Sequence, residues 1–542
     1  MRKWYVWTIL AVLAVVVGAR FVWASSDDTA TMTPSASEDW SRGRVMGLTA
    51  LKRRAALQVA ADGSAVLVWP NLEGQLQLVI VGLSGEVLVD TVLPHAESAV
   101  DPQLQIGQDG SIHILWREGP ATEASIRHLL LAADGTPSGE ALVLSDPASS
   151  SIADPRLVLD AQGRPHALWV DATGIYWAML DAQGTAVEDG GLLVADGFGL
   201  DVQADDAGAV HLIWQEEYDL NALKIFYALL DAETNAMTTP EEMLEIQNSG
   251  RLGIEEIALA LTDETGYVLV AGYDRSFDRY MFQHVAFALD EPSQKDEGIW
   301  VLRSGVGPVD ASPLGGQHTP LTFAISEQVG LGRQRIELQS AIISLQEGEL
   351  VEEVVSASPS ASSRSAVAVD SASNMHMVWL DTAGFRQYHV VYGSTSPTIK
   401  EQYDIMSPRD TLNAVLDQVF QLSLVVVGAF PGLVAWALVP FLGLVVYHLR
   451  TSEEALETSR SWIVLGVALL LEVVLSFAFP LHIISEISWA GIRWVAPAVS
   501  ALVAGGVTAF SLRGGRRGQF LSAFLLFTLV NTLVQVALYL LF

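Results

Sequence analysis

The sequence has 542 residues, too many for one ordinary compact domain, and contains no cysteine. The absence of cysteine excludes disulfides, thiolate metal sites and cysteine nucleophiles. The net charge of −32 has one source: residues 1–24 carry +3 and residues 411–542 are neutral, so residues 25–410 carry −35. A surface this acidic repels nucleic acid and anionic lipid, so we expect no nucleic-acid partner.

The N-terminus has the features of a segment that directs export. Met1-Arg2-Lys3 is followed by an apolar run from Trp4 to Val17 and then by Val22-Trp23-Ala24. A basic start, an apolar run and small or apolar residues at a cleavage site describe a secretory signal. Residues 1–24 are therefore predicted as a signal peptide, with an uncleaved signal anchor as the alternative, and residues 25–42 as a polar linker. In either case the following domain lies outside the cytoplasm.

Residues 43–396 contain a repeated pattern. The clearest unit has Asp160 and Gly163 in a turn, followed by His166 and Trp169. Related units hold, at the same offsets, Gly110/His113/Trp116, Gly208/His211/Trp214, His376/Trp379 and Gly63/Trp69. Two more units are degenerate, one with Gly266 at the turn position and one near residues 321–337. Each unit is typical of four short strands joined by tight turns, and seven such units predict an all-β domain, a seven-bladed β-propeller.

The ends of this region predict how the ring closes. The last unit supplies three strands, at about residues 366–370, 375–380 and 387–392, and residues 43–51 form a spare strand that could complete it. The Asp…Gly…His…Trp units resemble the degenerate repeats of bacterial sialidase-like (BNR-type) propellers over about 350 residues. The resemblance implies the propeller fold. The family's Ser-x-Asp-x-Gly-x-Thr-Trp box and Arg-Ile-Pro signature are not present in this sequence.

The C-terminal part is predicted to be an α-helical transmembrane bundle. Residues 397–423 are expected to form a linker and an amphipathic juxtamembrane helix that begins at Pro408. Mostly apolar runs long enough to cross a bilayer follow at about residues 424–448, 461–481, 489–512 and 519–542.

Loop charges support four spans. With the propeller outside, the connections that carry Arg450, Arg460, Arg513, Arg516 and Arg517 all lie in the cytoplasm, as the positive-inside rule requires. The predicted location is a cell membrane, multi-pass, with an extracytoplasmic propeller in a prokaryotic cell. The lipid bilayer is then one partner.

Candidate ligand-binding residues in the propeller are three aspartates. Asp101, Asp154 and Asp201 open successive blades near the central channel, where they could bind a ligand or a cation, or cap a local turn. The repeated His and Trp are interpreted as structural, because equivalent positions in different blades lie far apart and both faces of a blade pack against neighbours. We find no nucleophile elbow, phosphate loop or zinc spacing, so no catalytic residue, metal or cofactor is predicted.

The predicted membrane region contains one candidate site. Glu472 lies at the centre of the second span, where an ionisable residue usually faces the interior of the bundle. Asn531 and Gln535, at a similar depth in the fourth span, are its predicted hydrogen-bond partners. The group either holds helices together or binds an ion or a proton.

Three functions are therefore open. The first is a non-enzymatic, membrane-anchored propeller that binds or scaffolds an extracytoplasmic protein or glycan. The second is a sialidase-like carbohydrate-active enzyme, a hydrolase or a lyase. The third is a sensor or transporter component that uses Glu472.

Overall fold

The computed structural model describes two compact units, each taken here by itself. The propeller unit spans residues 28–405, within which the structure describes 32–94, 96–120, 123–145, 151–205, 207–219, 222–231, 234, 236–247, 252–262, 264–275, 279–301, 312–313, 321–330, 336–346 and 349–405. The C-terminal unit is described at residues 436–451, 458–478, 492–513 and 520–541. The predicted signal at residues 1–24 and the predicted helix that begins at Pro408 lie outside the described residues.

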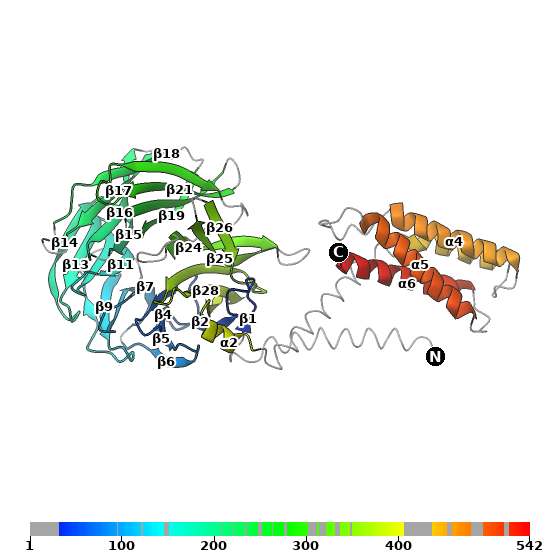
Figure 1. Cartoon of the computed structure of the whole chain (residues 1–542), viewed down its shortest axis with the longest axis horizontal. Coiled ribbons are helices and arrows are strands. Elements are labelled where there is room, and N and C mark those ends of the chain that lie inside the picture. The colour runs from blue at the N-terminus through cyan, green and yellow to red at the C-terminus, as the bar shows by residue number, and fades with distance from the viewer. Residues whose placement is uncertain are drawn as a thin grey trace. The chain divides into compact units, whose positions relative to one another are not determined.

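The described strands form seven sheets, which are the blades of the propeller (Figure 1). Blade 1 contains β3 (Ala56–Val59), β4 (Ala65–Pro70), β5 (Leu76–Val81) and β6 (Val87–Val92). Blade 2 contains β7 (Ala99–Ile106), β8 (Ile112–Glu118), β9 (Ser125–Leu131) and β10 (Leu142–Val143). Blade 3 contains β11 (Ala153–Leu159), β12 (Pro165–Asp171), β13 (Gly174–Leu180) and β14 (Val187–Ala195). Blade 4 contains β15 (Phe198–Ala204), β16 (Val210–Asp219), β17 (Ala222–Leu230) and β18 (Glu241–Gln247). Blade 5 contains β19 (Leu252–Leu261), β20 (Thr265–Asp274), β21 (Arg279–Ala288) and β22 (Lys295–Val301).

Blade 6 contains β23 (Ser312–Pro313), β24 (Leu321–Gly330), β25 (Ile336–Gln346) and β26 (Glu349–Val354). Blade 7 contains β27 (Ser362–Val369), β28 (Met375–Gly384) and β29 (Gln387–Ser394), to which β2 (Gly43–Thr49) and β1 (Met32–Thr33) are added. The first strands of successive blades contact one another, and β27 contacts β3. The predicted seven-bladed propeller is thereby confirmed.

Ring closure follows the sequence prediction. β2 pairs antiparallel with β29, with Arg44 opposite Tyr392 and Thr49 opposite Tyr388. In Figure 1 the dark-blue β1 and β2 lie beside the olive β28 and α2 (Pro397–Tyr403), although more than 300 residues separate them in the chain. Residues near both ends of the domain therefore share one sheet, and the edge that blade 7 would otherwise expose is paired.

Residues 32–42, expected as part of a polar linker, instead pack on the propeller. β1 pairs with β2, the Ala36 amide donates to the Val355 carbonyl, and Trp40 is 1% exposed. Trp40 joins an apolar cluster with residues of blades 6 and 7. A single large aromatic side chain thus fixes a segment whose composition is otherwise polar.

The repeated tryptophans form the cores between blades. Trp69 packs with residues of blade 7, Trp116 with blade 1 and Trp214 with blade 3. Trp169 and Trp379 likewise contact blades 2 and 6. Each Trp therefore fills the space between its own blade and the preceding one, as expected for a structural residue.

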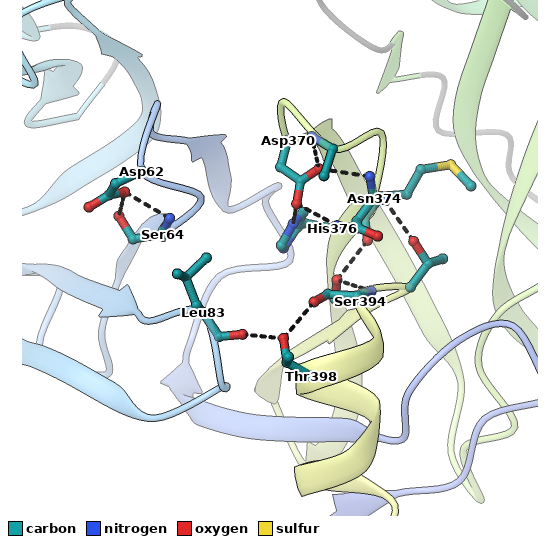
Figure 2. A network of polar contacts seen from close by, with 12 residues as sticks. Asp62, Ser64, Leu83, Asp370, Asn374, His376, Ser394 and Thr398 are labelled. Atoms are coloured by element: carbon teal, nitrogen blue, oxygen red, sulfur yellow. Dashed lines mark hydrogen bonds and ion pairs between the residues drawn. The ribbon is translucent and has the colours of Figure 1, made fainter.

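The repeated histidines brace the hairpin turns. Asp160 Oδ1 accepts hydrogen bonds from the Gln162 and Arg164 amides, while its Oδ2 lies 3.2 Å from His166 Nε2. In blade 7 Asp370 caps its turn in the same way and pairs with His376 (Figure 2). His376 also contacts the Tyr392 hydroxyl. The histidines are buried, consistent with the structural interpretation.

Blade 5 departs from the predicted turn. Gly266 is the second residue of β20 and lies opposite Leu261, so it is not in the turn. The turn is closed instead by the Thr262 amide, which donates to the Thr265 carbonyl. The space that a side chain at Gly266 would need is filled by the ring of Phe287, whose nearest atom lies 2.2 Å from a Cβ built there.

The short helix α2 is fixed to blade 1 immediately after the last strand. The Thr398 hydroxyl donates to the Leu83 carbonyl over 2.7 Å (Figure 2). The Tyr403 hydroxyl donates to the Gly85 carbonyl over 2.8 Å. Tyr403 is 1% exposed. The chain therefore leaves the propeller beside the turn that joins β5 and β6.

The C-terminal unit contains the helix Trp436–Thr451, α4 (Ser459–Ala478), α5 (Ile492–Arg513) and α6 (Phe520–Leu541). Among the described residues, two helical segments, Ser459–Phe477 and Val495–Leu512, are long and apolar enough to cross a membrane by length and composition. The other two apolar segments, Trp436–Thr451 and Leu521–Gln535, are shorter. A four-span bundle stays a prediction.

Candidate functional site

The strand register gives the propeller two distinct faces. Ala99, which begins the innermost strand β7, lies opposite Glu118, which ends β8. The first strands therefore begin, and the second strands end, at one face, which we call the mouth face. The turns that join first to second strands, such as the turn with Asp160, lie at the opposite face, which we call the turn face. α2 lies at the turn face, beside Leu83.

A β-bulge at the start of the innermost strands shapes the mouth face. The register shifts between Val100 and Gln103 in β7 and at the equivalent points in β11 and β15. Asp101 and Asp154 occupy this bulge with φ of 52° and 48°, in the left-handed region that aspartate tolerates better than most residues. Gly199 (φ 60°) takes the same position in blade 4. Asp201 is thus not the equivalent of the other two predicted aspartates.

Asp201 connects three blades. Its Oδ1 accepts a hydrogen bond of 2.9 Å from Arg156 Nε of blade 3, and its Oδ2 accepts one of 2.8 Å from the Leu259 amide of blade 5. Burial would lower the pKa of Arg156, but the carboxylates of Asp201 and Asp154 outweigh burial and raise it. Asp201 is 8% exposed. Its contacts are between blades, not within a local turn.

A second ion pair crosses the central channel. Arg54 Nη2 of blade 1 lies 3.1 Å from Glu256 Oε1 of blade 5, and both side chains are about one quarter exposed. Blades 1 and 5 are not neighbours in the ring, so the pair spans the channel. Asp101 meanwhile lies 3.6 Å from both Arg53 Nε and Arg117 Nη2. We call Arg53, Arg54, Arg117, Arg156, Asp101, Asp201 and Glu256 the channel-mouth cluster.

Two aromatic side chains stand exposed on the same face. Tyr218, near the end of β16, is 63% exposed, and Phe385, between β28 and β29, is 90% exposed. Lys224 Nζ lies 3.9 Å from the centre of the Tyr218 ring. Flat apolar rings on the same face as an array of guanidinium and carboxylate groups can stack on a ligand while the charged groups bind its polar atoms.

Asp381 is a buried carboxyl group at the end of the second strand of blade 7. Its Oδ1 accepts hydrogen bonds from the Ser362 hydroxyl over 2.5 Å and from Trp379 Nε1 over 3.0 Å. Burial raises the pKa of Asp381 to about 6. The residue is 1% exposed, so it joins β27 to β28 within blade 7 and does not reach a ligand.

The raised pKa of Asp381 makes propeller stability depend on pH. The folded state holds this proton more tightly than the unfolded chain does, so rising pH between about 4 and 6 destabilises the native state by about 3 kcal/mol. We expect Asp381→Asn to remove this loss. Urea unfolding of residues 28–405 should show that the free energy of unfolding of the variant increases relative to that of the wild type as pH rises from 4 to 7. A constant difference across that range would contradict the assignment.

The interior of the C-terminal unit holds a polar network. Glu472 of α4 accepts hydrogen bonds from the Thr528 hydroxyl over 2.7 Å and from Asn531 Nδ2 over 3.4 Å. Ser500 of α5 donates to Asn531 Oδ1 over 2.7 Å. Gln535 is fully buried, yet within the described helices neither of its amide atoms has a hydrogen-bond partner.

Sequence reasoning missed the arginines of the channel-mouth cluster and the hydroxyls around Glu472. Arg54 and Glu256 are about 200 residues apart, and only closure of the ring brings them together. Thr528 precedes the predicted partner Asn531 by about one helical turn, so helical spacing could have identified it. No comparable signal marks Arg54.

Comparisons with known proteins show the fold alone. No protein-family model and no curated protein matches this sequence. Among solved structures, the chain is similar to a family PL25 ulvan lyase, with 9% identity, 65% of this chain and 94% of that chain covered, and a TM-score of 0.47. It is also similar to the BP39L lectin from Burkholderia pseudomallei, with 13% identity, 62% and 98% coverage, and a TM-score of 0.42. A third likeness is to BBS1N in complex with ARL6DN, with 12% identity, 64% and 96% coverage, and a TM-score of 0.39. Similarity at this level assigns no function.

Proposed function

We propose that this chain is a membrane-anchored, extracytoplasmic β-propeller that binds a glycan through its mouth face. The observation that carries the proposal is the combination, on one face, of the channel-mouth cluster with the exposed rings of Tyr218 and Phe385. Arginine and carboxylate side chains suit the hydroxyl and acidic groups of a sugar chain, and exposed rings suit its apolar faces.

The distribution of charge supports the choice of face. The domain is strongly acidic, and Asp62, Asp109, Asp160, Asp205 and Asp370 all lie in turns of the turn face. The mouth face gathers four arginines around the channel, where they pair with Asp101, Asp201 and Glu256. The helix α2 also lies at the turn face, where Thr398 bonds to the Leu83 carbonyl.

The anchor is supported by composition. Two described helical segments are apolar and long enough to span a bilayer, and five of the six arginines of residues 411–542, all but Arg493, lie at connections that the positive-inside rule places in the cytoplasm. A cell-membrane location, with the propeller outside, is the arrangement that satisfies both features.

A carbohydrate-active enzyme is the alternative, and the carboxylates of the mouth face argue against it. A glycosidase needs two carboxyl groups free to act on the sugar. In the channel-mouth cluster, Asp101 and Glu256 are paired with arginines, and Asp201 with Arg156 and the Leu259 amide. These groups are placed to hold the blades and the ligand in position.

The test is a glycan array with residues 28–405, followed by variants of the exposed rings. We expect Phe385→Ala and Tyr218→Ala each to weaken binding about tenfold, since each removes a stacking surface worth about 1.4 kcal/mol. The matched control is Leu83→Ala, which removes an exposed apolar side chain (59%) from the turn face and should leave affinity unchanged.

The outcomes separate the hypotheses. Binding without turnover that depends on Phe385 and Tyr218 supports the proposal. Release of shortened or unsaturated products from any bound glycan would establish the enzymatic alternative. No glycan binding, together with capture of one defined protein through the same residues, would instead indicate a protein-binding propeller.

A further inference from the structure

The interior of the C-terminal helices contains a carboxylate without a described positive partner. Glu472 is fully buried, as are Ser500, Asn531 and Gln535. The basic residues of the described parts of α4, α5 and α6 are three arginines near helix ends: Arg460 is twelve residues before Glu472, Arg493 is seven before Ser500, and Arg513 is the last residue of α5. A buried carboxylate costs several kcal/mol unless a positive charge or a proton neutralises it.

The hydrogen bonds around Glu472 suit the charged form. Oε2 accepts from the Thr528 hydroxyl and Oε1 accepts from the Asn531 amide, so both oxygens already receive a donor. An amide NH₂ cannot accept a proton from a carboxylic acid. The network therefore offers donors to both carboxylate oxygens but supplies no countercharge.

Uncharged oxygen atoms converge on the same interior from two other helices. The hydroxyls of Ser500 and Thr528 and the amide oxygen of Asn531 belong to the network, and Gln535 lies one helical turn beyond Asn531 on α6 with both amide atoms unpartnered within the described helices. The unpartnered Gln535 amide therefore has hydrogen-bonding capacity that a bound ion could use.

We propose that Glu472, Ser500, Thr528, Asn531 and Gln535 form a binding site for a small monovalent cation, of which sodium is the best fit. Carboxylate, hydroxyl and amide oxygens are the ligands that hard cations prefer. A single carboxylate balances one positive charge and leaves the apolar interior neutral. A divalent ion would leave an uncompensated charge.

The test uses the full chain, purified in detergent, and measures its thermal unfolding in sodium chloride and in choline chloride of equal ionic strength. We expect sodium to raise the midpoint by about 3 °C or more, because a ligand that binds only the folded state stabilises it. Glu472→Gln keeps the shape and should abolish the sodium effect. Ser500→Ala should require about tenfold more sodium for half of the shift, as expected for loss of one neutral ligand worth about 1.4 kcal/mol.

Thr508→Ala is the matched control. Thr508 is a buried hydroxyl residue on α5, two turns beyond Ser500, and the variant should keep the full response to sodium. An equal shift with choline or potassium, or no shift with sodium in the wild type, overturns the proposal. So does a midpoint that responds to pH but not to sodium, which would identify the ligand as a proton. If Glu472→Gln does not fold, calorimetric titration with sodium takes its place. The wild type should then bind sodium, and Ser500→Ala should bind it about tenfold more weakly.

Discussion

Replacing Gly43 with valine is expected to lower the free energy of unfolding of the propeller by about 4 kcal/mol. Gly43 begins β2, the strand that closes the ring. A Cβ at this position would lie 2.3 Å from Thr33 Oγ1 and 2.6 Å from both the Trp379 ring and Val391. Trp379 cannot easily move aside, because it is 1% exposed and its Nε1 donates to Asp381.

Urea unfolding of residues 28–405 checks the Gly43 prediction. Gly139→Val is the control, because no atom lies within 4 Å of a Cβ built at Gly139. Its expected change is within about 0.5 kcal/mol, as for most exposed positions. If Gly43→Val were as stable as the control, β2 would not be packed into blade 7 in solution, and the ring would close in another way.

Asp201→Asn is expected to cost about 3 kcal/mol, the second largest effect. The asparagine has one acceptor oxygen, whereas Asp201 accepts from two donors, Arg156 and the Leu259 amide. The amide group must therefore face one of them with its own donors. The expected loss of stability is smaller than for a fully buried ion pair, because the Arg156 side chain is 23% exposed.

Asp154→Asn is the matched control for this prediction. Asp154 is exposed, and asparagine tolerates its positive φ, so the same chemical change should cost less than about 0.5 kcal/mol. In a double-mutant cycle, Arg156→Met should recover about 1–2 kcal/mol of the Asp201→Asn loss. Equal effects of the two asparagine variants would show that Asp201 does not join the blades.

The two degenerate units show how far the repeat alone could be followed. Blade 6 was located near residues 321–337 by counting, and β24 and β25 lie there, although no Trp marks them. Counting succeeded because a closed ring needs units of similar length. Counting also placed Gly266 in a turn, which is wrong. The glycine lies in a strand because the Phe287 ring occupies the space that a side chain there would need, and spacing does not reveal this contact.

The candidate sites were less accessible to sequence reasoning. Spacing identified Asp101 and Asp154 as equivalent, and their shared bulge confirms that equivalence. Spacing also grouped Asp201 with them, although its position corresponds to Arg156 of the preceding blade. A displacement of two residues keeps a side chain on the same side of a strand, so the hydrophobic pattern gives no warning.

By itself, the sequence determined the propeller, its seven units and its closure by residues 43–49, because each depends on local strand pattern and repeat length. It also determined that the repeated Trp and His residues are structural, since they recur at fixed offsets in successive units. Only the tertiary structure decided which charges meet at the channel mouth. Those contacts join residues such as Arg54 and Glu256, whose separation in the chain carries no periodic signal. It also decided that Thr528 and Asn531, and not Gln535, bond to Glu472.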